Sequence, residues 1–348
     1  QTITGGIEEG EVITMSVESI AAENIGAHTL AGNGVGSRPP QVDPLSNPTS
    51  TQDDIEIFGF LGTKTVEASV GDTAKTTATK INNFTGLTGV KAYAKTYAAL
   101  YSANATLQTY SVKINGYSTG NFVISSGDVQ DAVDAINQIS GSTGVTAHSE
   151  SNKVVLFDSD GDDITVENGQ TLAGHTNLRV QKVDETGEVA NVVGYLISLA
   201  LSGGNDSTRV TGTLKMTSPN AFSIDGKSTT GYTGTTAGST TATLKNLTQV
   251  NISTMLQAGD SISIIDAALD KVAQMRANLG AIENRLDYTI TNLMNIGERT
   301  ADSRSRLQDA DYALESSRLA KAQVIQQAGT QMLSQANQMT QLVLDLLR

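Results

Sequence analysis

The chain has 348 residues and a formal net charge of −13, and it contains neither cysteine nor tryptophan. The absence of cysteine excludes disulfides, thiolate metal sites and cysteine nucleophiles. The acidic balance argues against nucleic acid as a partner, because neutralising phosphates takes clustered Lys and Arg, and no apolar run is long enough to predict insertion into a membrane.

The first residues predict a strand rather than a leader sequence. No basic segment followed by an apolar one opens the chain, so these residues do not predict a signal peptide. Apolar and polar residues alternate between Glu11 and Ile20, which is typical of a strand in a hairpin. We therefore assign residues 1–38 to a β-hairpin segment.

The stretch from Gly36 to Asp54 contains four of the chain's five prolines. Proline fixes φ and lacks a backbone donor, so this composition predicts a linker or a domain entrance rather than a helix or strand. Short strand-like runs separated by turn residues continue beyond it, and we assign residues 39–250 to β-rich and α+β domains.

An internal repeat lies within these domains. Six residues recur in order at a constant offset of 55, so that Ile81, Asn82, Thr88, Gly89, Val90 and Ala92 match Ile136, Asn137, Thr143, Gly144, Val145 and Ala147. Each copy predicts a short helix that ends near the Ile-Asn pair, a loop with glycine, and a strand that starts at Thr-Gly-Val. We predict two α+β modules, near residues 66–100 and 110–168, followed by a β-rich part at 169–250.

From Ser261 onward the pattern is that of long helices. Apolar residues recur in steps of three or four up to Ile296, where Asp260 or Ser261 can cap the start and Gly297 stands where a helix ends. A second helical stretch follows up to the C-terminus. We therefore predict an α+β multidomain fold in which residues 251–300 and 301–348 form long, coiled-coil-like helices.

The apolar stripe on these helices has no matching helix elsewhere in the chain. Helices are stabilised mainly by packing such a stripe, so the partner is another chain or a segment that precedes Gln1. Packing within the chain stays an alternative, above all for the first of the two helices. The residues we predict at a subunit interface are Leu269, Leu279, Ile282, Leu286, Leu314, Ile325, Leu333 and Leu346.

No pattern predicts catalysis. The three histidines, His28, His148 and His175, lack the spacing of metal ligands, and the HExxH, GxSxG and P-loop motifs are absent. We therefore predict that the protein is not an enzyme and that it has no catalytic residue and no cofactor.

One acidic segment resembles a calcium loop in part. Asp158, Asp160 and Asp162 stand at the first, third and fifth positions, but Asp163 replaces the glycine of the sixth and Gly169 the glutamate of the twelfth. A hairpin turn at Asp160-Gly161 that joins two strands is the simpler interpretation. We predict no metal site here.

The C-terminal sequence closely resembles the C-terminal end of bacterial flagellins over about 85 residues, through motifs such as LGAIENRL, SRLQDADYA, QQAG and the terminal LLR. The segment EGEVITMSVESIAAENIG is similar to the family's strand region, and the repeated modules are similar to a motif of its variable outer domains. The family's N-terminal helices have no counterpart in this sequence, and we expect them either in residues that precede Gln1 or in a part that is supplied separately.

The resemblance implies a structural subunit of the bacterial flagellar filament that polymerises through its helices and serves swimming motility. Residues 1–38 would lie next to the filament core, 39–250 on its surface, 251–300 in the outer tube of the core and 301–348 in the inner tube. The implied partners are other flagellin subunits, an export chaperone on the C-terminal helix, and the filament cap and junction proteins. The implied location is extracellular, in the flagellum, reached through the flagellar export apparatus without a cleaved signal peptide.

Two alternatives stay open. A hook–filament junction protein shares the helical ends, although the tail LVLDLLR and the length of the match favour a flagellin. A surface flagellin homologue that binds polysaccharide would need a groove lined by aromatic side chains. The segment from Tyr93 to Tyr110 is the candidate for that groove, unless its tyrosines are half-buried strand residues.

Overall fold

The computed structural model describes residues 2–4, 12–14, 19–32, 38–171, 178–184, 196–226, 238–253 and 255–346. The chain divides into two compact units, one formed by Gln1–Val17 with Arg276–Arg348 and the other by Glu18–Met275. Antiparallel sheets, short helices and one long C-terminal helix confirm the predicted α+β fold class. The predicted domain boundaries stay predictions.

The first unit contains a strand pair and most of the long helix. Strands β1 (Thr2–Thr4) and β2 (Val12–Thr14) pair antiparallel, with Thr2 opposite Thr14. This pairing confirms a hairpin strand within the segment from Glu11 to Ile20. The helix is α5, Met255–Leu346, of which residues 276 onward belong to this unit.

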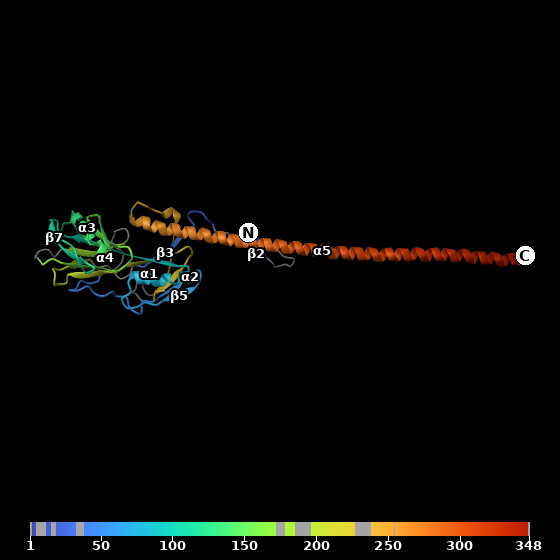
Figure 1. Ribbon diagram of the computed structural model, residues 1–348, viewed down its shortest axis with the longest axis horizontal. Coiled ribbons are helices and arrows are strands. Elements are labelled where there is room, and N and C mark those ends of the chain that lie inside the picture. Colours follow the sequence, from blue (N-terminus) through green and yellow to red (C-terminus); the bar gives the residue numbers. More distant parts are fainter. Residues whose placement is uncertain are drawn as a thin grey trace. The chain divides into compact units, whose positions relative to one another are not determined.

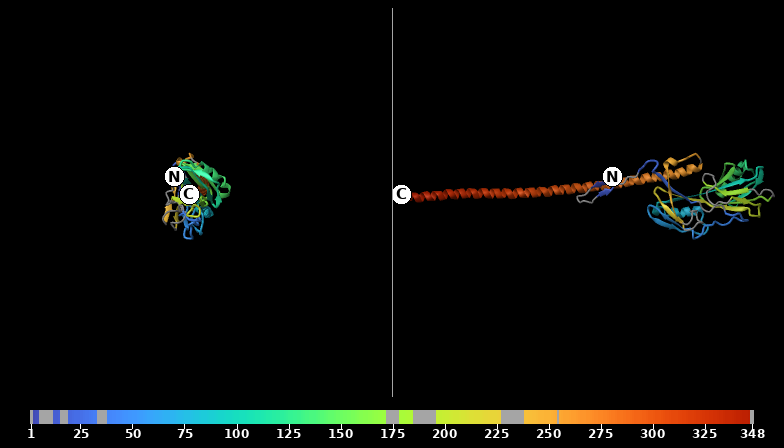
Figure 2. Two further views of the ribbon diagram at one scale, coloured as in Figure 1. Left: turned by 90° about the vertical axis from the view of Figure 1, so that its left-hand side faces the viewer. Right: turned by 180° about the vertical axis from the view of Figure 1, so that it is seen from behind.

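The second unit holds two modules that lie end to end along one strand, β6 (Lys91–Ser102) (Figure 1). Figure 2 shows the same arrangement from behind. Residues Lys91–Lys95 of β6 pair with β17, residues Thr96–Leu100 with β12 and residues Ala98–Ser102 with β14. The sheet order is β11-β12-β6-β17-β3-β20, and β14 pairs with both β6 and β15. The bounds of these strands are β3 (Gly26–Gly32), β11 (Val145–Glu150), β12 (Lys153–Asp158), β14 (Leu178–Lys182), β15 (Ile197–Leu199), β17 (Thr213–Ser218) and β20 (Thr243–Asn246).

Module 1 packs helices α1 (Ala74–Asn82) and α2 (Thr85–Thr88) beside the first half of β6. Its buried core contains Ile57, Ile81, Ala92 and Met216. A second sheet in the order β19-β18-β4-β5 belongs to it, with β4 (Ile55–Phe58), β5 (Thr63–Val66), β18 (Ser223–Gly226) and β19 (Gly238–Thr241).

Module 2 repeats this plan on the second half of β6, with helices α3 (Gln130–Asn137) and α4 (Ser140–Thr143). Leu100, Ile136 and Val166 belong to its core. Its strands form a sheet in the order β16-β13-β8-β9 and the pair β7-β10, with β7 (Gln108–Tyr110), β8 (Val112–Ile114), β9 (Tyr117–Ser118), β10 (Phe122–Ile124), β13 (Ile164–Asn168) and β16 (Ser207–Val210).

The predicted helix–loop–strand pattern is present in both copies of the repeat. α1 and α3 end at the Asn of each Ile-Asn pair, and Gly89 and Gly144 are the C-cap residues of the short helices that follow. These two glycines have φ values of 75° and 73°, in the left-handed region that glycine adopts without steric cost. The chain then turns directly into a strand in each module.

The proline-rich segment lies along β16 and forms no helix or strand among its described residues, 38–54. Its one ladder contact is the isolated bridge between Gln41 and Ser207. Further bonds run from Arg38 N–H to the Arg209 carbonyl at 2.8 Å and from Arg209 Nε to the Leu45 carbonyl at 2.6 Å. The prediction that this segment is not a regular element is confirmed.

Three local predictions about turns and ends are wrong. No hairpin joins β12 to β13, because β12 pairs with β11 and β6 while β13 pairs with β16 and β8. Helix α5 begins at Met255, so Asp260 and Ser261 lie inside it and do not cap it. The helix also continues through Gly297, because one glycine costs only about 1 kcal/mol within a helix of strong helix formers.

A 3₁₀ turn, η1 (Leu247–Gln249), follows β20 and leads toward α5. The Leu247 N–H donates to the carbonyls of Ala22 and Ile25, which fixes this turn against the residues that precede β3. The turn therefore sets where α5 starts relative to the sheet of its own unit.

Candidate assembly surface

The first turns of α5 pack against the sheet of their own unit. Ile264 and Ala267 are buried against Ala27 of β3, and Leu247 and Val250 pack around them. Small alanines on this face allow the helix to approach the strand closely. We call this segment of α5, residues 255–275, the root of the helix.

Polar contacts fix the root in position. Asp270 pairs with Lys91 of β6 at 3.0 Å, and Asp260 pairs with Lys215 of β17 at 2.5 Å. The Ser261 hydroxyl donates to the Asn251 carbonyl at 2.9 Å and accepts the Asn251 N–H at 3.1 Å. The two acidic residues thus face lysines of the sheet, which gives the root a defined orientation.

The other face of the root is apolar and exposed. Ile262, Ile265 and Leu269 point away from the buried contact, and Leu269 is 63 % exposed. Packing within the chain, the alternative to a subunit interface, is therefore found at Ile264 and Ala267 and not at Leu269. Neither Ile264 nor Ala267 was among the predicted interface residues. The buried residues were missed because both faces of this segment carry apolar side chains.

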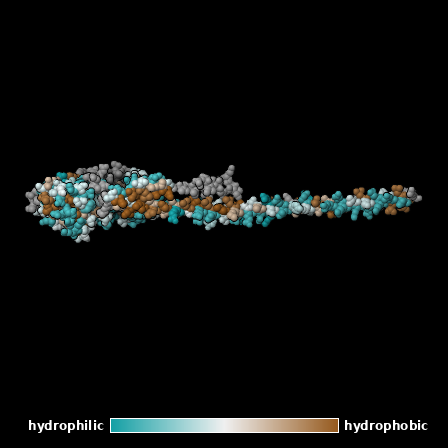
Figure 3. All heavy atoms as spheres, turned by 90° about the horizontal axis from the view of Figure 1, so that it is seen from above, coloured by the Kyte–Doolittle hydropathy of each residue, from teal (hydrophilic) through white to brown (hydrophobic). Residues whose placement is uncertain are grey.

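The remaining predicted interface residues all lie on the part of α5 that belongs to the first unit. Ile282 and Leu286 are half-buried. Hydrophobic side chains, brown in Figure 3, recur along the visible face of the helix. The exposed residues among these remaining seven are Leu279, Leu314, Ile325, Leu333 and Leu346.

The described residues cover no face of the last part of α5. Every side chain that the structure describes between Ala301 and Leu346 is exposed. Leu333 is 65 % exposed and Leu346 is 85 % exposed. Fully burying one such side chain stabilises a protein by roughly 1.5–3 kcal/mol, so this stripe is a strong potential binding surface.

In the acidic segment that resembles a calcium loop, the carboxylates bond to other groups of the protein. Asp158 Oδ1 accepts the N–H groups of Asp160, Gly161 and Asp162 at 2.9, 2.9 and 3.2 Å. Lys75 Nζ pairs with Asp160 at 3.1 Å and with Asp162 at 2.9 Å. Burial raises the pKa of Asp158, although the three N–H groups oppose this shift. The arrangement is a capped turn between two sheets.

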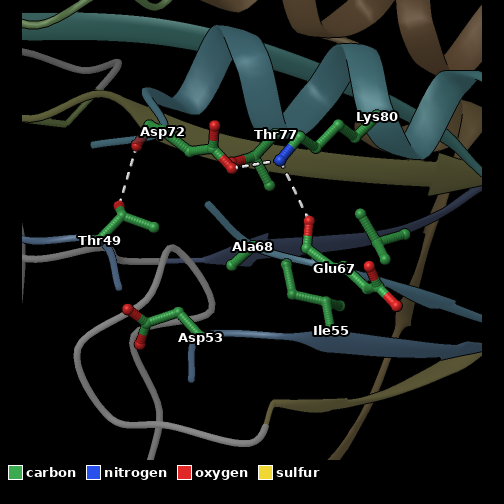
Figure 4. A pocket seen from close by; sticks show the side chains of 9 residues that line it. Thr49, Asp53, Ile55, Glu67, Ala68, Asp72, Thr77 and Lys80 are labelled. Carbon is green, nitrogen blue, oxygen red and sulfur yellow. Dashed lines mark hydrogen bonds and ion pairs between the residues drawn. The ribbon is translucent and has the colours of Figure 1, made fainter. Parts of the chain in front are cut away.

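A second polar cluster lines a small pocket in module 1 (Figure 4). Lys80 Nζ reaches Asp72 at 2.6 Å and the Glu67 carbonyl at 3.1 Å. The Thr49 hydroxyl donates to the Asp72 carbonyl at 2.9 Å, and Asp53 holds the preceding turn through Ser50. These groups tie α1 to the proline-rich segment, so their role is structural.

A buried amine and a buried carboxylate lie where the two modules meet. Lys182 is 1 % exposed and donates to the Gly212 carbonyl at 3.1 Å, and burial lowers its pKa to about 7 while Asp163 opposes the shift. Asp163 accepts bonds from Asn47 at 2.7 Å and from Arg209 at 3.1 Å. Burial raises the pKa of Asp163 despite these partners.

The tyrosines proposed to line a sugar-binding groove do not share a surface. Tyr97 is buried and stacks on Phe157 with ring centroids 4.9 Å apart. Tyr110 is fully buried in the core of module 2, next to Phe122. Only Tyr93 of this set is among the exposed large residues. The half-buried strand interpretation fits these side chains better.

Among the described residues, His, Asp and Glu side chains nowhere gather in threes in a way that could hold a metal ion. Within the same ranges, no helix combines the length and hydrophobicity that crossing a membrane requires. His175 lies outside the described residues, whereas His28 stands in β3 and His148 in β11.

Comparison with known proteins identifies the helical part. A family model described as the bacterial flagellin C-terminal helical region matches residues 262–347. B-type flagellin of Pseudomonas aeruginosa is 35 % identical over 293 residues, which cover 80 % of this chain and 57 % of that protein. Flagellin B of Vibrio cholerae is 46 % identical over 98 residues, 28 % of this chain and 26 % of the relative.

A third relative has a shorter and closer match. Flagellin of Salmonella choleraesuis is 52 % identical over 84 residues, which cover 24 % of this chain and 17 % of that protein. The match therefore spans little more than half the length of the Pseudomonas relative, and 26 % and 17 % of the lengths of the other two.

Proposed function

This chain belongs to the bacterial flagellin family, and from that premise we propose that it is a structural subunit of the flagellar filament. The observation that carries the proposal is the uncovered apolar stripe on α5, whose described side chains from Ala301 to Leu346 are all exposed. Removing that stripe from water against neighbouring copies provides a driving force for polymerisation.

The eight predicted interface residues divide into three groups under this proposal. Leu269 and Leu279 extend the stripe from the root, and Ile282 and Leu286 contribute less because they are already half-buried. The other four stand where α5 is fully uncovered and contribute most, namely Leu314, Ile325, Leu333 and Leu346.

Partners and location follow from the same premise. We propose that other flagellin subunits are the principal partners and that an export chaperone covers the terminal apolar stripe before assembly. The filament cap and junction proteins would contact the ends of the polymer. The proposed location is extracellular, in the flagellum, with export through the flagellar apparatus. The role is mechanical, with residues 39–250 on the outside, and we propose no enzymatic activity.

The two alternatives are less well supported. The polysaccharide-binding homologue needs a shared aromatic surface, and the burial of Tyr97 and Tyr110 speaks against one in the segment proposed for it. A hook–filament junction protein shares the helical ends, but the relatives that match this chain are named as flagellins.

The proposal is tested by placing a charge in the stripe of the full-length protein. Leu333→Asp should reduce filament growth on seeds at least about tenfold, because an unpaired carboxylate would be buried at each subunit contact. The matched control is Gln335→Asp, which stands about 200° further around the helix. Growth is measured by sedimentation and electron microscopy, and urea unfolding checks that the modules stay folded. Normal filaments from Leu333→Asp would contradict the assignment.

A further inference from the structure

The hairpin turn between β4 and β5 presents an apolar surface. Phe60 and Leu61 are its two central residues, and the turn is closed by Gly59 N–H to the Gly62 carbonyl at 3.0 Å and by the reverse bond at 3.3 Å. Hairpin turns of this length usually carry Asn, Asp or Gly. Four side chains of this region, which we call the Phe–Leu patch, are 39, 41, 57 and 53 % exposed: Phe58, Phe60, Leu61 and Leu87.

The patch is held rigidly by its own module. A Cβ added to Gly59 would stand 1.9 Å from the Thr88 carbonyl oxygen, and one added to Gly89 would stand 2.0 Å from the Phe60 ring. The turn is therefore packed directly onto the end of α2, as the neighbouring labels α2 and β5 in Figure 1 also indicate. A preformed surface of this kind needs little ordering before it binds.

Module 2 shows that the fold does not require these apolar residues. At the repeat offset of 55, Phe60-Leu61 corresponds to Asn115-Gly116, which forms the β8–β9 turn with φ values of 49° and 84°. Asn115 donates to the Thr143 carbonyl at 3.1 Å and accepts the Thr165 N–H at 2.8 Å. In module 2, polar contacts therefore hold the equivalent turn.

Leu87 shows the same contrast, since Ser142 replaces it in module 2. Both residues are exposed on the short second helix of their module. The apolar residues of module 1 are therefore a feature of its surface and not of the shared architecture.

Charge and size limit what can cover the patch. Residues 57–65 and 82–90 contain no carboxylate and one cation, Lys64, although the chain as a whole has a net charge of −13. An acidic molecule such as a second copy is therefore not repelled here. The four side chains present on the order of 300–400 Å², well below the roughly 800 Å² per partner of a stable complex. The patch cannot hold a partner from dilute solution by itself.

We propose that the Phe–Leu patch packs against a second copy of this chain inside the polymer, as a lateral contact that is secondary to α5. The proposal rests on the filament function above. Subunits already joined through α5 are held at high effective concentration, so even a small apolar contact can then form between them. Such a contact would couple neighbouring outer domains, away from the helices.

The absence of cysteine from the chain allows a direct test with single thiols. Leu87→Cys and its matched control Ser142→Cys are introduced one at a time into the full-length protein. A maleimide reagent then labels dilute monomer and polymer. We expect both thiols to react comparably in monomer, and Leu87→Cys to react at least about tenfold more slowly in polymer while Ser142→Cys changes little. Each variant is assembled as a minority with wild-type protein, so assembly does not depend on the variant.

Three results would overturn the proposal in distinguishable ways. Equal labelling of both thiols in polymer would contradict the lateral contact and leave the proposed filament function untouched. Protection of Leu87→Cys already in dilute monomer means that another part of the same chain covers the patch. Failure of the wild-type full-length protein to polymerise removes the filament function and the lateral contact together.

Discussion

The side chain of Asn82 forms two hydrogen bonds with the backbone of Ala92. Its Nδ2 donates to the Ala92 carbonyl at 2.8 Å, and the Ala92 N–H donates to its Oδ1 at 2.8 Å. Asn137 makes the same pair of bonds with Ala147 at 2.9 and 2.8 Å. Since Ala92 pairs with Met216 of β17 on its other side, the carboxamide takes the place of a missing neighbouring strand.

Removing this carboxamide should destabilise the module. Asn82→Ala leaves the N–H and the carbonyl of Ala92, a residue that is only 2 % exposed, without their partners. At roughly 1 kcal/mol per net hydrogen bond, we expect the free energy of unfolding to fall by about 2 kcal/mol. Urea unfolding followed by circular dichroism measures the change.

The neighbouring Asn83 provides the control. It is the C-cap residue of α1, which it joins through its backbone N–H, and its side chain is exposed. Asn83→Ala should therefore change the free energy of unfolding by less than about 0.5 kcal/mol. Equal effects of the two substitutions would mean that the two bonds of Asn82 contribute nothing beyond helix propensity.

The repeat shows how far sequence alone predicts this fold. Helix, loop and strand follow from short-range signals, namely an apolar helix face and the left-handed positions Gly89 and Gly144. The contact from Asn82 to Ala92 spans only ten residues but needs the strand's unpaired edge, which no local pattern indicates. The predicted hairpin between β12 and β13 was wrong for the same reason, because the partners of both strands come from distant segments.

The apolar stripe on α5 was easier to predict than the packing of the root. Apolar spacing selects residues such as Leu333 without knowledge of any partner, because helix periodicity alone defines a stripe. The root was missed because its buried residues, Ile264 and Ala267, pack on Ala27, more than 200 positions earlier in the sequence. The GFLG sequence could have predicted the Phe–Leu patch, since apolar residues are unusual between two turn glycines.

Replacing the buried amine should stabilise the protein. Lys182→Met keeps a long side chain at a position that is 1 % exposed and removes the desolvation of a charge. A pKa lowered by burial means that the fold disfavours the charged amine, so removing it should raise the free energy of unfolding near neutral pH by on the order of 1 kcal/mol or more. Because the pKa of Lys182 is about 7 in the fold and 10.5 in the unfolded chain, the unfolded state binds more protons between these values. Wild-type stability should therefore rise with pH across this window, and Lys182→Met should lose that rise.

Lys113→Met is the matched control for this experiment. Lys113 pairs with Glu167 but its side chain is 44 % exposed, so little desolvation is relieved. We expect little change in the free energy of unfolding and an unchanged pH profile between pH 7 and about pH 10. A loss of stability in Lys182→Met, together with a preserved rise above pH 7, would show that the amine is not the titrating group.

His28 should make the second unit sensitive to mild acid. Burial, and to a smaller extent the charge of Lys271, lower the pKa of His28 below 6.5. The unfolded chain therefore takes up a proton first, and the free energy of unfolding should decrease as pH falls below 6.5. His28→Gln should remove this contribution, whereas Lys271→Met should retain most of it because burial is the larger cause. A pH profile identical in wild type and His28→Gln would rule out this contribution.

The uncovered stripe should be visible in the monomer as weak protection of α5. Helices without tertiary packing are marginal in water, and the side chains described from Ala301 to Leu346 are all exposed. In dilute full-length monomer, backbone amides of this segment should exchange at least about a hundredfold faster than those near Ile264 and Ala267, which are buried in the root. Hydrogen exchange with mass spectrometry measures both segments in one sample, so the root serves as the internal reference. Polymerisation should raise the protection of the terminal segment toward that of the root. If the two segments are equally protected in dilute monomer, the stripe already has a partner within the full-length chain, and its burial cannot be what drives assembly.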